Sequence, residues 1–170
     1  MRAPQCWRPM AEGDLAAAMA VAAEVHPDYP ESPAVFAERL RLYPEGCAVL
    51  ADGPRIAGYR ICHPWTPGSP PPLNTLIGRI PPRPATLLLH DLALTQDARG
   101  RGHARVIVEA TVSLAAREGL PDVTLMAVAG TTPFWAGMGF REGGSRRPAP
   151  DRDGYGVGAM LMMRSIGTQA

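Results

Sequence analysis

The chain has 170 residues, a length typical of one domain, and 46% of them are hydrophobic, which is enough for one substantial core. The net charge is +1 and all 17 basic residues are arginine, so the charge balance does not indicate a polyanion-binding surface. No stretch reaches the roughly 20 apolar residues of a membrane span, and the start lacks the apolar run of a secretory signal. We therefore expect a single domain over residues 1–170, cytoplasmic, with neither nucleic acid nor a membrane as partner.

The three cysteines are Cys6, Cys47 and Cys62. Their spacing matches no metal-binding motif, and an odd, sparse count argues against a disulfide framework. We expect reduced thiols and no bound metal.

The first part of the chain alternates extended and helical signals. The elements expected in order are a strand at 5–10, helices at 14–25 and 32–43, and strands at 47–51 and 56–62. Asp14 and Ser32 are helix-capping residue types, and Pro33 suits the first position of a helix. Prolines then crowd residues 63–84, too densely for a helix or a central strand. This loop is either an inert insertion or a wall of a binding pocket, since long ordered loops are often functional.

The second part of the chain alternates buried strands with helices. The expected elements are a strand at 85–94, a helix at 102–118, a strand at 123–128, a short helix at 132–137, and strands at 140–142 and 157–164. Gly119 suits the positive φ of a residue that ends a helix, and Thr132 and Pro133 suit the start of the short one. The order of elements favours a mixed sheet with helices on both faces.

A turn rich in glycine and arginine joins the strand at 85–94 to the helix at 102–118. It consists of Arg99, Gly100, Arg101, Gly102, His103 and Ala104. A turn that leads into a helix directs several backbone N–H groups to one point, at the positive end of the helix dipole. The two glycines let the main chain approach phosphate oxygens, and the two arginines can add charge. The turn is a candidate pyrophosphate site, although such a short motif alone also fits an ordinary surface turn.

In its context this turn resembles the phosphate loop of the GNAT superfamily of acyl-CoA N-acyltransferases, Gln/Arg-x-x-Gly-x-Gly/Ala, which residues 99–104 match throughout. The hydrophobic strand before it and the later PFWAGMGFRE of residues 133–142 are also similar to the family. The resemblance implies an α/β (α+β) fold with a mixed, mostly antiparallel sheet of six to seven strands, about four flanking helices and splayed central strands.

The resemblance also implies where coenzyme A binds. Acetyl-CoA would be the co-substrate, its pantetheine arm lying between the splayed strands and bonded to the main chain of Leu92, Ala93 and Leu94. The family commonly has an asparagine after the fifth strand, which this sequence lacks, and Thr131 or Thr132 could replace its hydrogen bonds. We expect Thr131 and Trp135 on the cofactor side.

Transfer to an amine requires proton removal. An alkyl ammonium with a pKa of about 10.4 loses its proton at a cost of roughly 4 kcal/mol at neutral pH, so a general base helps. His90 is the preferred base, because its pKa lies near the working pH and some family members use histidine at this strand position. Asp91 is the rival, and His90 could instead be a buried neutral side chain. Regular alternation along the strand predicts that only one of the two faces the reacting centre.

The family often has a tyrosine in the short helix that protonates the departing thiolate. This sequence has Trp135 there, and an indole cannot act as such an acid. Tyr155, Thr131, Thr132 or solvent are the remaining candidates, and a thiol with a pKa of about 8.5 needs little help to leave.

The implied activity is an N-acetyltransferase that moves an acetyl group from acetyl-CoA to a primary amine of a small molecule or peptide by direct attack, as a monomer or homodimer. The alternative is a non-catalytic acyl-CoA-binding sensor that kept the cofactor loop and lost the acid–base residues. In the family the first two helices and their connection border the acceptor pocket. Candidates for that border are Glu24, His26, Asp28 and Tyr29, with His63 and Trp65 as a possible aromatic wall.

Overall fold

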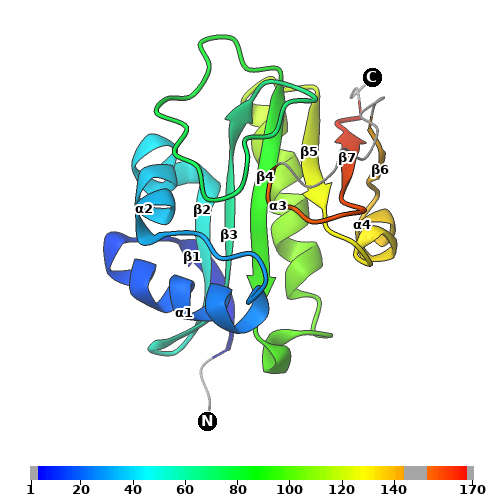
Figure 1. Cartoon of the computed structure of the whole chain (residues 1–170). Coiled ribbons are helices and arrows are strands. Elements are labelled where there is room, and N and C mark those ends of the chain that lie inside the picture. The colour runs from blue at the N-terminus through cyan, green and yellow to red at the C-terminus, as the bar shows by residue number, and fades with distance from the viewer. Residues whose placement is uncertain (1–3, 144–152, 168–170) are drawn as a thin grey trace.

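The computed structural model describes residues 4–143 and 153–167. Within them the strands and helices follow the expected order (Figure 1). Their bounds are β1 Cys6–Pro9, α1 Leu15–Val25, α2 Pro33–Leu42, β2 Cys47–Asp52, β3 Arg55–Trp65, β4 Thr86–Leu94, α3 His103–Arg117, β5 Asp122–Ala127, α4 Thr132–Gly137, β6 Arg141–Glu142 and β7 Met160–Ser165.

The strands form one seven-stranded sheet in the order β1-β2-β3-β4-β5-β7-β6. Neighbours pair antiparallel except β4 and β5, which are parallel because α3 connects them as a crossover. The predicted mixed, mostly antiparallel sheet is therefore confirmed.

The central strands β4 and β5 separate soon after they meet. Their ladder consists of Leu87 opposite Val123 and Leu88 opposite Thr124, near the start of each strand. Farther along, β4 pairs with β3 alone and β5 with β7 alone. The predicted splay is thus present, and it leaves two strand edges facing each other across a gap.

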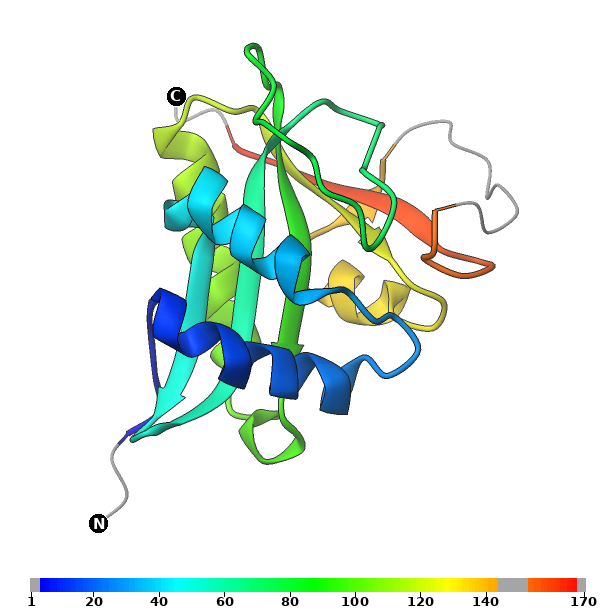
Figure 2. The ribbon, with the colours of Figure 1, turned by 60° about the vertical axis from the view of Figure 1, so that its left-hand side comes forward.

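Helices cover both faces of the sheet (Figure 2). α1 and α2 pack on one face through Ala18, Val21, Phe36 and Leu40. α3 packs on the other face, and its cluster includes Val108, Leu114 and Ala115 together with Leu87 and Leu89 of β4 and residues of β5 and β7. Among the residues described, no helix has the length and apolar character needed to cross a membrane.

Strand β3 is longer than expected and includes His63, Pro64 and Trp65, which the sequence assigned to the loop. The pairing of β2 with β3 ends at Cys47 opposite Ile61, so the end of β3 bonds to β4 alone. A proline is tolerated in such a stretch because one side of the strand needs no N–H donor.

Contrary to the expectation from the sequence, neither Asp14 nor Ser32 caps its helix through the side chain. The Asp14 side chain accepts a hydrogen bond from the main chain of Ala11 and pairs with Arg8, instead of capping α1. Ser32 is the N-cap residue of α2 without a side-chain cap bond, whereas Pro33 occupies the first turn as expected. Gly119, with φ of +68°, follows α3 as predicted.

Candidate active site

The turn at 99–104 leads from β4 into α3. Gly100 and Gly102 adopt φ of +72° and +84°, and nothing lies within 4 Å of a Cβ built on either. Arg99 donates through Nε to the carbonyl of Leu94 at 3.0 Å, which fixes the turn to the end of β4. Strand β1 supports it from outside, since Trp7 Nε1 donates to the carbonyl of His103 at 3.0 Å. The turn is therefore fixed to β4 and β1, and the space beside its two glycines is open.

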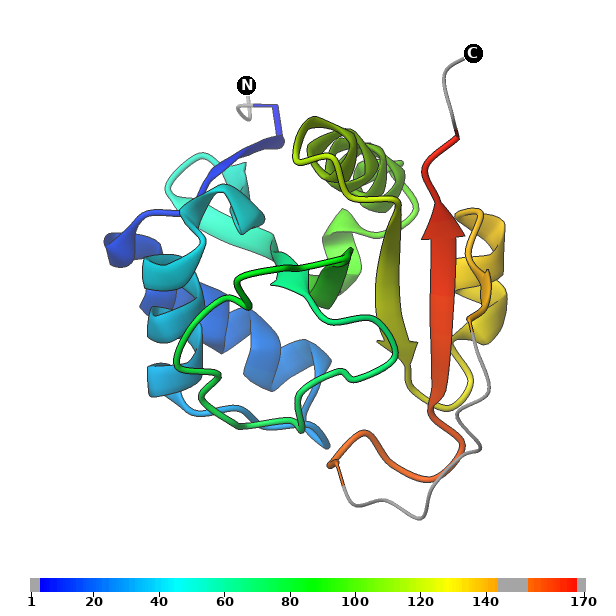
Figure 3. The same cartoon turned by 90° about the horizontal axis from the view of Figure 1, so that it is seen from above.

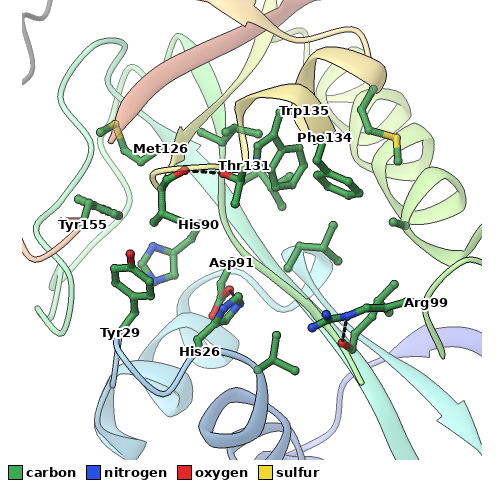
Figure 4. Close-up of a pocket in the computed structure, with 18 of the residues that line it drawn as sticks. His26, Tyr29, His90, Asp91, Arg99, Met126, Thr131, Phe134, Trp135 and Tyr155 are labelled. Carbon is green, nitrogen blue, oxygen red and sulfur yellow. Dashed lines mark hydrogen bonds and ion pairs between the residues drawn. The ribbon is translucent and has the colours of Figure 1, made fainter. Parts of the chain in front are cut away.

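A cavity of about 780 Å³ runs from this turn between β4 and β5 to the connection between α1 and α2. Most of its surface is apolar. Figure 4 shows Arg99, Phe134 and Trp135 toward one end and the polar side chains of His26 and His90 toward the other. The cavity therefore lies where β4 and β5 separate.

Strand β4 carries a bulge at His90. Ile61 of β3 pairs with Asp91 and the next residue, Cys62, pairs with Leu89, so His90 is an extra residue in β4. The bulge interrupts alternation, and both His90 and Asp91 line the cavity. The regular alternation that the sequence analysis assumed for this strand is therefore wrong at His90, and which of the two side chains faces the reacting centre stays a prediction.

Asp91 is bonded to two side chains. Its Oδ1 lies 3.1 Å from Nε2 of His26, the residue that ends α1. Its Oδ2 accepts a hydrogen bond from the hydroxyl of Tyr59, a fully buried residue of β3. The side chain of His26 is 29% exposed and lines the cavity. The imidazole of His26 can therefore accept a proton in the cavity while the carboxylate of Asp91 holds it.

Electrostatics couples His26 and Asp91. Burial alone would lower the pKa of His26, but the hydrogen bond and charge of Asp91, assisted by the carbonyl of Leu92, raise it above its usual value. Burial alone would raise the pKa of Asp91, but its hydrogen bond and ion pair with His26 and the bond from Tyr59 lower it. An ionised Asp91 thus stabilises the protonated form of His26.

His90 has a different partner. Its Nε2 lies 2.7 Å from Oε1 of Glu31, and the two side chains are only 1% and 4% exposed. Its Nδ1 has no hydrogen-bond partner among the described residues. The ring of His63 lies 6.3 Å away, and burial, followed by the charge of His90, lowers the pKa of His63 to about 3.

The other candidates divide between cavity and surroundings. Most of the other predicted site residues line the cavity: Leu92, Leu94, Arg99, Gly100, Gly102, His103, Ala104, Thr131, Trp135 and Tyr155. Ala93 and Arg101 do not line it. Ala93 packs in the core beneath α1 and α2. The Tyr155 hydroxyl donates to the carbonyl of Pro71 at 2.7 Å, and burial raises its pKa. Thr131 donates to the carbonyl of Val128.

Of the residues considered for the acceptor side, His26 and Tyr29 line the cavity. Glu24 and Asp28 are exposed and do not. His63 and Trp65 lie outside it, stacked edge to face at 5.2 Å.

Sequence reasoning missed the pairing of His26 with Asp91 and the contact of Glu31 with His90. Both contacts depend on how the α1–α2 connection meets the bulge. The only signal was the position of His26 and Glu31 around that connection.

Comparison with known proteins agrees with this geometry. The model of the "Acetyltransferase (GNAT) family" matches residues 14–140. Among solved structures, the GphF GNAT-like decarboxylase in complex with isobutyryl-CoA is 22% identical, with 95% of this chain and 100% of that chain covered and a TM-score of 0.78. The loading GNATL domain of CurA from Lyngbya majuscula is 12% identical, with 96% and 98% covered and a TM-score of 0.81.

A third structure, the ribosomal-protein-S18-alanine N-acetyltransferase from Escherichia coli, is 19% identical, with 98% and 97% covered and a TM-score of 0.69. No curated protein sequence matches the chain. The structural likenesses show a shared fold at low identity, and the family model spans most of the chain. The chain belongs to the GNAT family of acetyltransferases.

Proposed function

We propose that the protein is an N-acetyltransferase that moves the acetyl group of acetyl-CoA to a primary amine of a small molecule or peptide by direct attack. The observation that carries the proposal is the single cavity that joins the phosphate turn to His26 and Asp91. One end offers backbone amides and Arg99 to an anion, and the other offers a proton acceptor.

The diphosphate of coenzyme A fits the turn at 99–104, where positive-φ glycines leave the main chain open. Its pantetheine arm carries amide groups and can bond to the edge of β4 that β5 leaves unpaired, as an added strand would. Leu92 and Leu94 provide apolar contacts along that path. Trp135 and Thr131 border it from α4.

In the chemical step the neutral amine nitrogen attacks the thioester carbonyl, a C–N bond forms and the C–S bond breaks. We assign the proton of the amine to the imidazole of His26, directly or through water. Asp91 stabilises the resulting imidazolium. The departing thiolate takes a proton from solvent, since a thiol with a pKa of about 8.5 leaves readily.

His90 remains a second candidate base. Its burial and its contact with Glu31 make it less accessible than His26, whose side chain is 29% exposed. A sensor that only binds acyl-CoA has no need of an accessible histidine backed by a carboxylate. The pair His26 and Asp91 therefore supports catalysis over the sensor.

Thiol release from acetyl-CoA, measured against a panel of amines and peptides, tests the proposal. We expect His26→Gln to lower kcat/KM by about 100-fold and His90→Gln to lower it less, with coenzyme A affinity by calorimetry unchanged in both. Asp28→Asn is the control, because Asp28 is a nearby exposed carboxylate outside the cavity. Unchanged turnover in His26→Gln would remove His26 from the mechanism, and coenzyme A binding without thiol release from any acceptor would favour the sensor.

A further inference from the structure

The proline-rich segment at 66–85, between β3 and β4, crosses the end of the cavity opposite the phosphate turn. We call it the strap. Figure 3, seen from above, shows it passing between α2 and the turn that precedes β7. Leu73 of the strap lines the cavity together with Tyr29 and Tyr155. Leu73 therefore makes the strap part of the pocket wall. The contacts that hold the strap on its two sides determine how rigid this wall is.

On one side a buried ion pair of α2 holds the strap. The carboxylate of Glu38 accepts hydrogen bonds from the main chain of Ile77 at 2.8 Å and Gly78 at 2.9 Å. Arg39 pairs with Glu38 at 2.6 Å and donates to the carbonyl of Thr75 at 3.0 Å. Glu38 and Arg39 are 7% and 1% exposed, so these charged hydrogen bonds are shielded from water.

A second contact ties the strap to the polar end of the cavity. The side-chain oxygen of Asn74 accepts a hydrogen bond from the main-chain N–H of Ser32 at 2.7 Å, and the main-chain N–H of Asn74 donates to Glu31 at 2.9 Å. The other carboxylate oxygen of Glu31 contacts His90. One carboxylate therefore joins the strap to the bulge of β4.

On the opposite side the strap is bonded to the segment before β7. The N–H of Leu73 donates to the carbonyl of Asp153 at 2.7 Å, and the Tyr155 hydroxyl donates to the carbonyl of Pro71 at 2.7 Å. Gly154 approaches so closely that a Cβ there would lie 3.1 Å from Cβ of Leu73. The strap thus spans the cavity end and is fixed at both sides.

From this arrangement we infer that the acceptor is a compact primary amine with an apolar body, and not a polypeptide chain. An extended peptide needs an open path for the residues that follow its amine, and a strap bonded to α2 on one side and to the segment before β7 on the other narrows the way past Leu73. Leu73, Tyr29 and Met126 offer apolar contacts to a small body, while His26, held by Asp91, lies at the same end of the cavity for its amine. The inference rests on the proposed acetyltransferase activity and narrows its substrate class.

The test compares kcat/KM for compact aryl and alkyl amines with kcat/KM for short peptides that offer an N-terminal or lysine amine. We expect compact amines to be favoured by at least about tenfold. Leu73→Ala widens the pocket and should shift preference toward bulkier amines by about tenfold. Leu76→Ala is the matched control on the same strap, because Leu76 is 57% exposed and outside the cavity.

Two results would overturn the inference while leaving the acetyltransferase proposal intact. One is turnover of peptides equal to or above that of compact amines. The other is the same size preference in Leu73→Ala and Leu76→Ala. Absence of thiol release with both classes of acceptor would end the acetyltransferase proposal and the inference with it.

Discussion

The imidazole of His26 lies 3.1 Å from the carboxylate of Asp91, which brings the end of α1 into contact with the bulge of β4. Asp91 raises the pKa of His26, so Asp91→Asn should lower it. With rates expressed per neutral amine, we expect the acid limb of kcat/KM to move to lower pH and the plateau to fall by at least about tenfold, because a weaker base removes the proton less effectively. A pH–rate profile of both proteins checks this, and an acid limb at the same pH in both would contradict it.

The phosphate turn gives a prediction on cofactor affinity. Gly102→Ala places a Cβ in a left-handed conformation beside the expected phosphate path, and we expect coenzyme A to bind at least about tenfold more weakly by calorimetry. Gly53→Ala is the control, since Gly53 also has a positive φ and open space around it but lies in the β2–β3 turn. Equal losses of affinity in the two variants would show that backbone strain, and not the phosphate site, is responsible.

His63 predicts a loss of stability in acid. Its pKa is about 3 in the folded chain, because burial disfavours the charged ring. In the unfolded chain the value is about 6.5, so the unfolded state binds one more proton between these pH values and stability falls as the pH falls. From pH 7 to about pH 4.5, the free energy of unfolding should fall by about 2 to 3 kcal/mol more in the wild type than in His63→Gln.

Urea denaturation of the two proteins at both pH values measures this difference. The variant serves as its own reference for every other titrating group, since only residue 63 changes. Parallel losses of stability in both proteins would mean that His63 does not carry the effect.

The ion pair of Glu38 and Arg39 predicts that breaking a buried pair costs more stability than breaking an exposed one. Glu38→Gln leaves the buried guanidinium of Arg39 without its carboxylate partner and should destabilise the fold by about 3 to 5 kcal/mol. Glu109→Gln breaks the pair with Arg164, in which Glu109 is 50% exposed, and should cost no more than about 1 kcal/mol. Denaturation midpoints and slopes compare the two, and similar costs would refute the assigned burial effect.

Local chemistry determined the elements that sequence reasoning predicted well. Helical spacing, Pro33 and Gly119 marked helix ends, and the RGRGHA motif marked the turn that leads into α3. Those signals act within a few residues, so they can be read along the chain.

The polar end of the cavity could not be derived in the same way. The bulge at His90 arises from the register of β3 against β4, and the contacts of His26 and Glu31 require α1 and its connection to reach that bulge. The extension of β3 through Pro64 likewise depends on where β2 stops. Each of these features is set by distant partners, which one-dimensional spacing does not specify.

The short ladder between β4 and β5 has a mechanical consequence. The parallel ladder joins the two halves of the sheet, β1 to β4 and β5 to β7, through two residue pairs. A molecule that bonds to both separated edges would therefore act as a missing strand. Part of the binding free energy of this molecule would then stabilise the two halves of the sheet against separation. Coenzyme A should accordingly slow amide exchange in β5 and β7 as well as in β4, because a filled gap resists the opening of either half.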